Sequence, residues 1–169
     1  MIESFSANKD KAKFVNYHVP IYASCEDFDR NPKRYLYALF NWVPNFDRFK
    51  VMTVYENHIH AFKRTKPLIS STPVEKGGTV YVGDGAYGTF NIYKCNPDAT
   101  RGIFQNYTFT NNFWMTDVLE DRVEHTAYNS HGAVIDHYVQ NISDYKITGN
   151  EPPTPSPTLS DLEPSEDIF

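Results

Sequence analysis

Three of the six histidines stand where their side chains could share a metal site. His58 and His60 are two residues apart in an extended segment, so their imidazoles project to the same side. That spacing suits ligation of one metal ion or of two adjacent ions. His18 ends another strand-like segment, and functional sites of α/β sheets assemble at the carboxyl ends of parallel strands. We therefore expect His18, His58 and His60 to converge on metal.

The other three histidines have structural surroundings. His125 and His137 alternate with other residues within strand patterns, and His131 lies in a turn beside a glycine, so none of them is expected to join the metal site. Residues 83–88 (GDGAYG) match the G-x-G-x-x-G dinucleotide fingerprint. No helix-forming segment follows them to hold a pyrophosphate, so we interpret these glycines as a turn.

The first half of the chain predicts a strand, a helix and a second strand. Residues 13–18 have strand composition up to Pro20, and residues 50–55 form the next strand-like run. Between them, residues 32–46 carry apolar side chains at helical spacing, and a bend is expected near Pro44. This order predicts a parallel strand pair with a right-handed crossover.

The second half predicts an antiparallel meander. Four strand-like runs, residues 79–82, 113–119, 123–128 and 133–140, are separated by Gly, Asn, Asp or Ser turns and by no helical pattern. Such a meander would close one side of a sheet or sandwich, so the chain as a whole is expected to be α/β.

Composition separates a folded part from a tail. Residues 151–169 contain five prolines, five acids and no Lys or Arg, and are predicted to be a disordered acidic tail. These acids account for the whole net charge of −5 of the 169-residue chain, which leaves the single domain predicted over residues 1–150 formally neutral. Without a basic cluster, nucleic-acid binding is excluded as an expected function.

Cellular location is indicated by a few short features. No apolar run approaches the roughly 20 residues that cross a bilayer, and the first residues lack the pattern of a signal peptide. Two sequons, at Asn106 and Asn141, point toward the secretory route and a glycoprotein. Cys25 and Cys95 are predicted to be either buried thiols or one isolated bridge.

Three segments, in this order, resemble the purple acid phosphatases of the metallophosphoesterase (calcineurin-like phosphoesterase) superfamily. Residues 15–20 (VNYHVP) are similar to their V-x-x-H motif, and residues 57–65 (NHIHAFKRT) to G-H-x-H-A-[YF]-x-R-[ST]. Residues 78–85 (GTVYVGDG) are similar to the glycine-rich strand that follows. The likeness extends over residues 13–138, which is nearly the whole predicted domain.

The resemblance implies a fold, a metal centre and a reaction. The fold would be the C-terminal half of a metallophosphoesterase β-sandwich flanked by helices. The centre would be dinuclear, with one ferric ion and a second ion of iron, zinc or manganese, and it would hydrolyse phosphate monoesters. By motif matching, His18 and His58 would bind the divalent ion and His60 the trivalent one.

The sequence departs from the family pattern at several positions. Asn57 replaces the glycine that opens G-H-x-H, and Phe28, between Asp27 and Asp29, stands where many plant members place a histidine. The earlier D-x-G, G-D-x-x-Y and G-N-H-[DE] blocks, which supply the bridging Asp and other ligands, are missing from the residues before His18.

These departures leave three functions open. The first is acid-phosphatase-like hydrolysis by a longer, extracellular or secretory protein, of which this chain is the histidine half as a fragment, a truncated gene model or a truncated paralogue. The second is a catalytically inactive chain that binds a metal or a partner protein. The third is a complete enzyme with a mononuclear zinc site of three histidines.

Overall fold

The computed structural model describes residues 2–23, 32–83, 86–91 and 102–147, and places three short helices and ten strands among them. In chain order the elements are α1 (Ile2–Ala7), β1 (Phe14–Tyr17), α2 (Pro32–Asn41), α3 (Val43–Arg48), β2 (Thr53–Glu56), β3 (Phe62–Thr65), β4 (Leu68–Ile69), β5 (Thr72–Pro73), β6 (Val80–Gly83), β7 (Phe104–Thr108), β8 (Asn112–Val118), β9 (Arg122–Asn129), β10 (Val134–Asn141) and the 3₁₀ turn η3 (Ile142–Tyr145).

Five of these strands form a mixed sheet in the order β1-β2-β6-β3-β7. β1, β2 and β6 run parallel, β3 is antiparallel to β6, and β7 is antiparallel to β3. The predicted parallel pair is therefore confirmed, with α2 and α3 in the connection between its strands. The predicted single helix is two helices that meet at Trp42, two residues before Pro44, whose ring is compatible with the first turn of α3.

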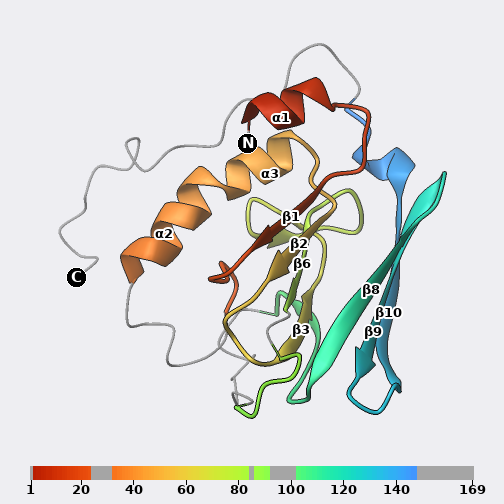
Figure 1. Cartoon of the computed structure of the whole chain (residues 1–169). Helices are drawn as coiled ribbons and strands as arrows, with labels where there is room; N and C mark the ends of the chain where they lie inside the picture. The colour runs from red at the N-terminus through yellow and green to blue at the C-terminus, as the bar shows by residue number, and fades with distance from the viewer. Residues whose placement is uncertain (1, 24–31, 84–85, 92–101, 148–169) are drawn as a thin grey trace.

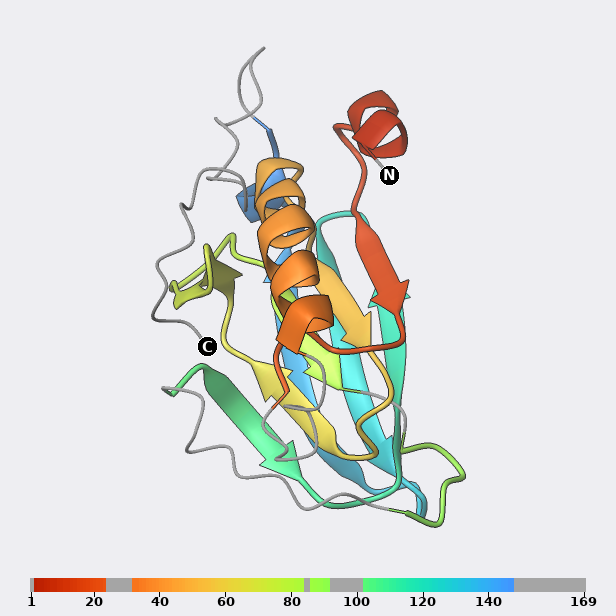
Figure 2. The same ribbon diagram turned by 90° about the vertical axis from the view of Figure 1, so that its left-hand side faces the viewer.

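Three of the four strand-like runs predicted as an antiparallel meander form a separate antiparallel sheet in the order β10-β9-β8. The prediction was wrong for residues 79–82, because β6 is a parallel strand of the five-stranded sheet, paired with β2. The three-stranded sheet packs against one face of the five-stranded sheet, while α2 and α3 cover the other face (Figures 1 and 2). The result is a sandwich with helices on one outer side, which agrees with the α/β expectation. The predicted domain end at residue 150 and the tail lie outside the described residues.

Alternation along β2 explains this layering. Val54 is fully buried among apolar side chains from α3 and β6, including Phe46 and Tyr81. Its neighbours Thr53 and Tyr55 point to the opposite face and contact the three-stranded sheet. Because successive side chains of a strand face opposite sides, one short strand contributes to both layers of the core.

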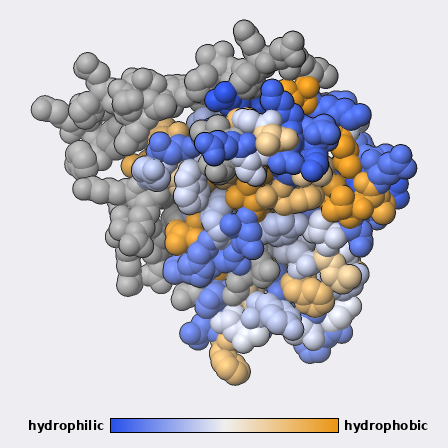
Figure 3. Space-filling view, turned by 45° about the horizontal axis from the view of Figure 1, so that its top comes forward, coloured by the Kyte–Doolittle hydropathy of each residue, from blue (hydrophilic) through white to orange (hydrophobic). Residues whose placement is uncertain are grey.

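The surface of the described residues is mixed in character. On the face shown in Figure 3, apolar side chains reach the surface in several groups between hydrophilic ones. In the described part of the chain, no helix is long and apolar enough to cross a membrane.

Candidate functional site

The strands β1 and β2 end side by side and deliver His18 and Asn57 to the same edge of the sheet. Their register pairs Tyr17 with Glu56, the last residue of each strand. The next peptide continues this pairing, because the Asn57 amide donates a hydrogen bond to the His18 carbonyl at 3.1 Å. The parallel pair thus places two of the predicted metal-binding segments next to each other.

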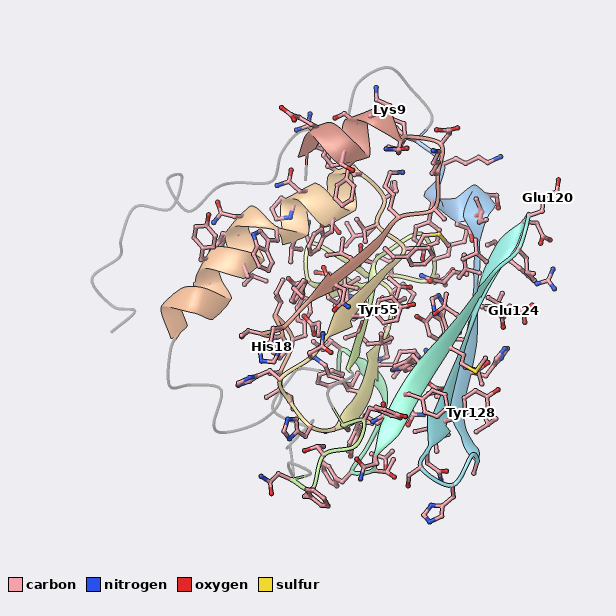
Figure 4. The ribbon with its side chains drawn as sticks, in the orientation of Figure 1. Lys9, His18, Tyr55, Glu120, Glu124 and Tyr128 are labelled. Carbon is pink, nitrogen blue, oxygen red and sulfur yellow. The ribbon has the colours of Figure 1, made fainter. Side chains whose placement is uncertain are left out.

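The structure brings His18 and His58 into direct contact. His58 Nδ1 lies 3.0 Å from His18 Nε2, and the two rings meet edge to face with their centroids 4.9 Å apart. Both side chains are exposed, and Figure 4 shows His18 at the end of β1, away from the three-stranded sheet that carries Glu124 and Tyr128. A ligand could therefore reach both imidazoles from solvent.

The turn that carries His58 has an uncommon backbone conformation. The φ angle of His58 is +67°, and the Ile59 amide donates to the Asn57 carbonyl at 2.7 Å, so three residues form a tight γ-turn. Positive φ is rare for residues other than glycine, and such strain is concentrated at functional sites.

Asn57, which stands where the motif that this segment resembles has glycine, anchors this turn to β1. Its side-chain nitrogen Nδ2 donates to Asn16 Oδ1 and to the Tyr17 carbonyl, each at 2.8 Å. The substitution thus adds two contacts between the segments that carry His18 and His58.

His60 lies in a different hydrogen-bond environment. Its Nδ1 is 2.7 Å from the Asn91 carbonyl oxygen and 3.1 Å from the Thr89 hydroxyl. Because a carbonyl only accepts, Nδ1 carries the proton and the lone pair of a neutral ring lies on Nε2. A carbonyl contact of this kind is typical of metal-binding histidines, whose second nitrogen is oriented by a backbone acceptor.

Electrostatics at His58 favour the neutral ring. Partial desolvation lowers the pKa of His58 although its side chain is exposed, and the neighbouring His18 and His60 lower it further by charge repulsion. A neutral imidazole is the form that coordinates a metal ion, so less proton competition is expected at this ligand.

The histidine pair fits part of the coordination shell of one ion. Two nitrogens that each lie about 2.0–2.1 Å from the same zinc ion are roughly 2.9–3.4 Å apart at octahedral or tetrahedral angles. The observed 3.0 Å between His18 Nε2 and His58 Nδ1 falls in this range. The described residues do not complete the shell, because they contain no group of three His, Cys, Asp or Glu side chains placed to hold an ion.

A dinuclear centre would need further ligands. A bridging carboxylate is the usual means of holding two cations close together. Asp27, Asp29 and Asp84 lie outside the described residues, as do Phe28 and both cysteines. The remaining histidines belong to the other sheet: His125 is buried on β9, His131 is in the β9–β10 turn, and His137 is exposed on β10.

Sequence reasoning missed a buried ion pair that joins β2 and β3, the strands before and after the His58–His60 segment. Glu56 is fully buried, and its Oε2 accepts a hydrogen bond from Lys63 Nζ at 2.5 Å. Its Oε1 accepts from the Tyr17 hydroxyl and from the Ile21 amide, both at 2.6 Å. The sequence signal that could have indicated this pair is two opposite charges. Glu56 directly follows the strand-like run of residues 50–55, and Lys63 lies three residues after the H-x-H motif.

The glycine-rich segment also has an explanation that does not involve nucleotides. A Cβ atom on Gly83 would lie 2.4 Å from Cγ of Lys63, so the absence of a side chain lets Lys63 cross β6 toward Glu56. Residues 84–85 lie outside the description, and no helix begins in residues 86–91. The predicted turn therefore agrees with the described part of this segment.

Comparisons with known proteins give a fold and no sequence family. No family model matches the chain, and no curated protein matches it. Its structure resembles a purple acid phosphatase, PPD1 from yellow lupin (Lupinus luteus) seeds, with a TM-score of 0.69 and 15% identity over 88% of this chain. It also resembles GAP50, the anchor in the inner membrane complex of Plasmodium, with a TM-score of 0.58 and 13% identity over 83% of this chain. The chain spans 30% and 40% of these two proteins, and it has the fold of part of a purple acid phosphatase.

Proposed function

We propose that this chain is the histidine half of a metal-dependent phosphomonoesterase of the acid phosphatase type. The observation that carries the proposal is the 3.0 Å approach of His18 Nε2 and His58 Nδ1 at the ends of two parallel strands. The likeness of fold to the lupin purple acid phosphatase supports it, together with the motif order around both histidines.

In this proposal each histidine has a defined task. His18 and His58 hold the divalent ion, and His60 would contribute Nε2 to the second ion, with its Nδ1 proton held by the Asn91 carbonyl. The metal centre, of iron with zinc, manganese or iron, would supply Lewis-acid activation of the phosphate and of the attacking water. Further carboxylate ligands are expected from a longer protein, and the two sequons favour a secretory route for it.

The test is zinc binding by the isolated chain, measured by isothermal titration calorimetry. One Zn²⁺ should bind, and His18→Ala and His58→Ala should each lower the affinity at least about tenfold, since each removes a ligand. The matched control is His137→Ala, which removes an exposed histidine of β10. Affinity that is unchanged in both site variants would rule the proposal out.

A second candidate is a catalytically inactive module that binds a partner protein. It is favoured by the shared fold with the Plasmodium anchor protein and by the absence of a three-ligand group among the described residues. This candidate predicts that zinc leaves the thermal unfolding midpoint of the chain unchanged, whereas the metal site predicts a rise that depends on His18 and His58.

A further inference from the structure

The Glu56 carboxylate and the Lys63 ammonium group form an ion pair that connects the segment of His18 with the segment of His58. Glu56 itself lies two residues before His58, and Lys63 lies three residues after His60. Glu56 Oε1 accepts from the Tyr17 hydroxyl, immediately before His18. The side chains of Glu56 and Lys63 are both almost completely buried.

The segment after His18 is attached to the same pair at two further points. The Ile21 amide donates to Glu56 Oε1 at 2.6 Å, and the Tyr22 carbonyl accepts from Lys63 Nζ at 2.5 Å. His18 is therefore flanked on both sides, at residue 17 and at residues 21–22, by backbone or side-chain groups bound to Glu56 and Lys63.

A buried ion pair is a weak source of net stability. The cost of removing both charges from water roughly cancels their attraction, and replacement by apolar residues of similar volume is often neutral or stabilising. The Lys63 side chain nevertheless requires glycine at position 83, because a Cβ atom on Gly83 would collide with Cγ of Lys63. The geometry that the pair imposes is a better explanation of its presence than the stability that it adds.

We infer that the Glu56–Lys63 pair is a positioning device, which fixes the segments of His18 and His58 so that their nitrogens converge on one metal ion. The inference rests on the metal-binding part of the proposed function. Glu56 and Lys63 act through the histidine-bearing segments and do not bind the metal, because both side chains are buried whereas the His18 and His58 side chains are exposed.

The test replaces the pair by apolar residues of similar size, Glu56→Leu with Lys63→Met. The expected variant folds cooperatively in urea but loses the nuclear Overhauser contact between the His18 and His58 rings in the metal-free protein. Its Zn²⁺ affinity, measured by calorimetry, falls about tenfold or more, in the range seen when groups that orient metal ligands are removed.

The matched control is the other ion pair of β3, which is partly buried. Arg64 donates to Asp136 of β10 through Nε at 2.5 Å and through its second terminal nitrogen at 3.0 Å, on the face of β3 opposite to Lys63. The double variant Arg64→Met with Asp136→Leu should keep both the ring contact and the zinc affinity. If both double variants lose the ring contact and the zinc affinity equally, a general loss of packing in the sandwich is the cause and the inference is wrong.

The remaining outcomes also decide the question. A ring contact and a zinc affinity that both survive in the Glu56→Leu, Lys63→Met variant would overturn the positioning role. If that variant does not fold, Tyr17→Phe removes only the hydroxyl that joins the β1 end to Glu56. It should lower zinc affinity about threefold or more, and unchanged affinity would overturn the inference.

Failure of the proposed function gives a different result. In that case zinc binding by the unmodified chain would not depend on His18 or His58, whereas the ring contact, which needs no metal, would still report on the positioning role.

Discussion

His125 shows how one buried side chain makes the sandwich sensitive to pH. It is completely buried between the two sheets and stacks on Tyr138 with ring centroids 4.4 Å apart. Its ring nitrogens face four polar side chains, Gln140 and Thr53 at Nε2 and Thr116 and Tyr55 at Nδ1. The Gln140 amide nitrogen donates to the Met52 carbonyl, so its oxygen faces His125 and Nε2 carries the proton.

We expect this residue to make the protein less stable in mild acid. Burial lowers the pKa of His125 to about 4, whereas in the unfolded chain the pKa is about 6.5. Between these values the unfolded state binds more protons, so stability falls as the pH drops through this window and the loss is complete near the lower value. The free energy of unfolding should be about 2 kcal/mol lower at about pH 5 than at about pH 7.

Urea denaturation at the two pH values measures this difference. His125→Gln should be less stable near neutrality but should lose most of the pH dependence, whereas His131→Gln, in an exposed turn, should keep it. A pH dependence that is the same in all three proteins would contradict the assignment to His125.

Asn57 gives a second prediction at the residue scale. Although the purple acid phosphatase motif that this segment resembles has glycine here, Asn57→Gly should lower the free energy of unfolding by about 1–2 kcal/mol, because it removes the two hydrogen bonds to Asn16 and to the Tyr17 carbonyl. Asn16→Ala, which removes one of these bonds, should cost less. Denaturation midpoints that rise in Asn57→Gly would show that the glycine conformation is preferred.

At the scale of elements, the helical layer is held by the face that α2 and α3 turn toward the sheet. Phe46 of α3 is completely buried, with its ring centroid 6.4 Å from Tyr17 of β1 and 6.5 Å from Tyr81 of β6. Tyr37 of α2 is 58% exposed.

Truncation of these two side chains should therefore have very different effects. Phe46→Ala should lower the free energy of unfolding by about 3–5 kcal/mol, because it leaves a cavity between helix and sheet. Tyr37→Ala should stay within about 0.5 kcal/mol of the original protein. Denaturant titration of both variants checks this, and equal effects would mean that the helices do not pack on the sheet as described.

The sequence predicted the elements whose residue types match their surroundings. β-branched and aromatic residues marked β1 and β2, and three- and four-residue spacing marked the helices between them. The predicted second strand stopped at Tyr55, because a charged residue such as Glu56 is uncommon in a buried strand. β2 nevertheless includes Glu56, since Lys63 forms an ion pair with its carboxylate. β3, with sequence FKRT, was missed for the same reason, since two of its four residues are charged and find their partners elsewhere in the fold.

The approach of His18 and His58 was predictable to a similar extent. Strand ends and the H-x-H spacing were enough to select His18 and His58, because parallel neighbours end at the same sheet edge. The contact that orients His60 comes from residues 89–91, which follow it by about thirty positions, and no local pattern relates these segments. The ligand assignment of His60 stays a prediction.

At the scale of the whole molecule, both sheets end in strands that could pair further. β1 is first in the order of its sheet and pairs only with β2 among the described residues. In the three-stranded sheet, the outer strands β8 and β10 carry exposed apolar side chains, Met115, Val118, Val134 and Val139. Unpaired edges with apolar surface favour association with another chain.

We therefore expect the isolated 169-residue protein to aggregate readily, to bind at most one transition-metal ion tightly and to lack phosphatase activity above background. The physical reason for the metal limit is charge, since neutral imidazoles do not offset the repulsion between two cations about 3.5–4 Å apart. Metal analysis, p-nitrophenyl phosphate hydrolysis and light scattering measure the three properties. Two bound ions with turnover abolished by His60→Ala would contradict this, and would indicate that Asp27, Asp29 or Asp84 bridges the metals.

The contact between His18 and His58 joins positions 40 residues apart, across two helices and a parallel strand pair. Closing a loop of that length costs chain entropy before any contact compensates for it, and parallel pairing of this kind forms slowly. The two imidazoles therefore meet only after the β1–β2 pair has assembled. An ion held between them would accordingly slow the unfolding of the protein and leave its folding rate almost unchanged.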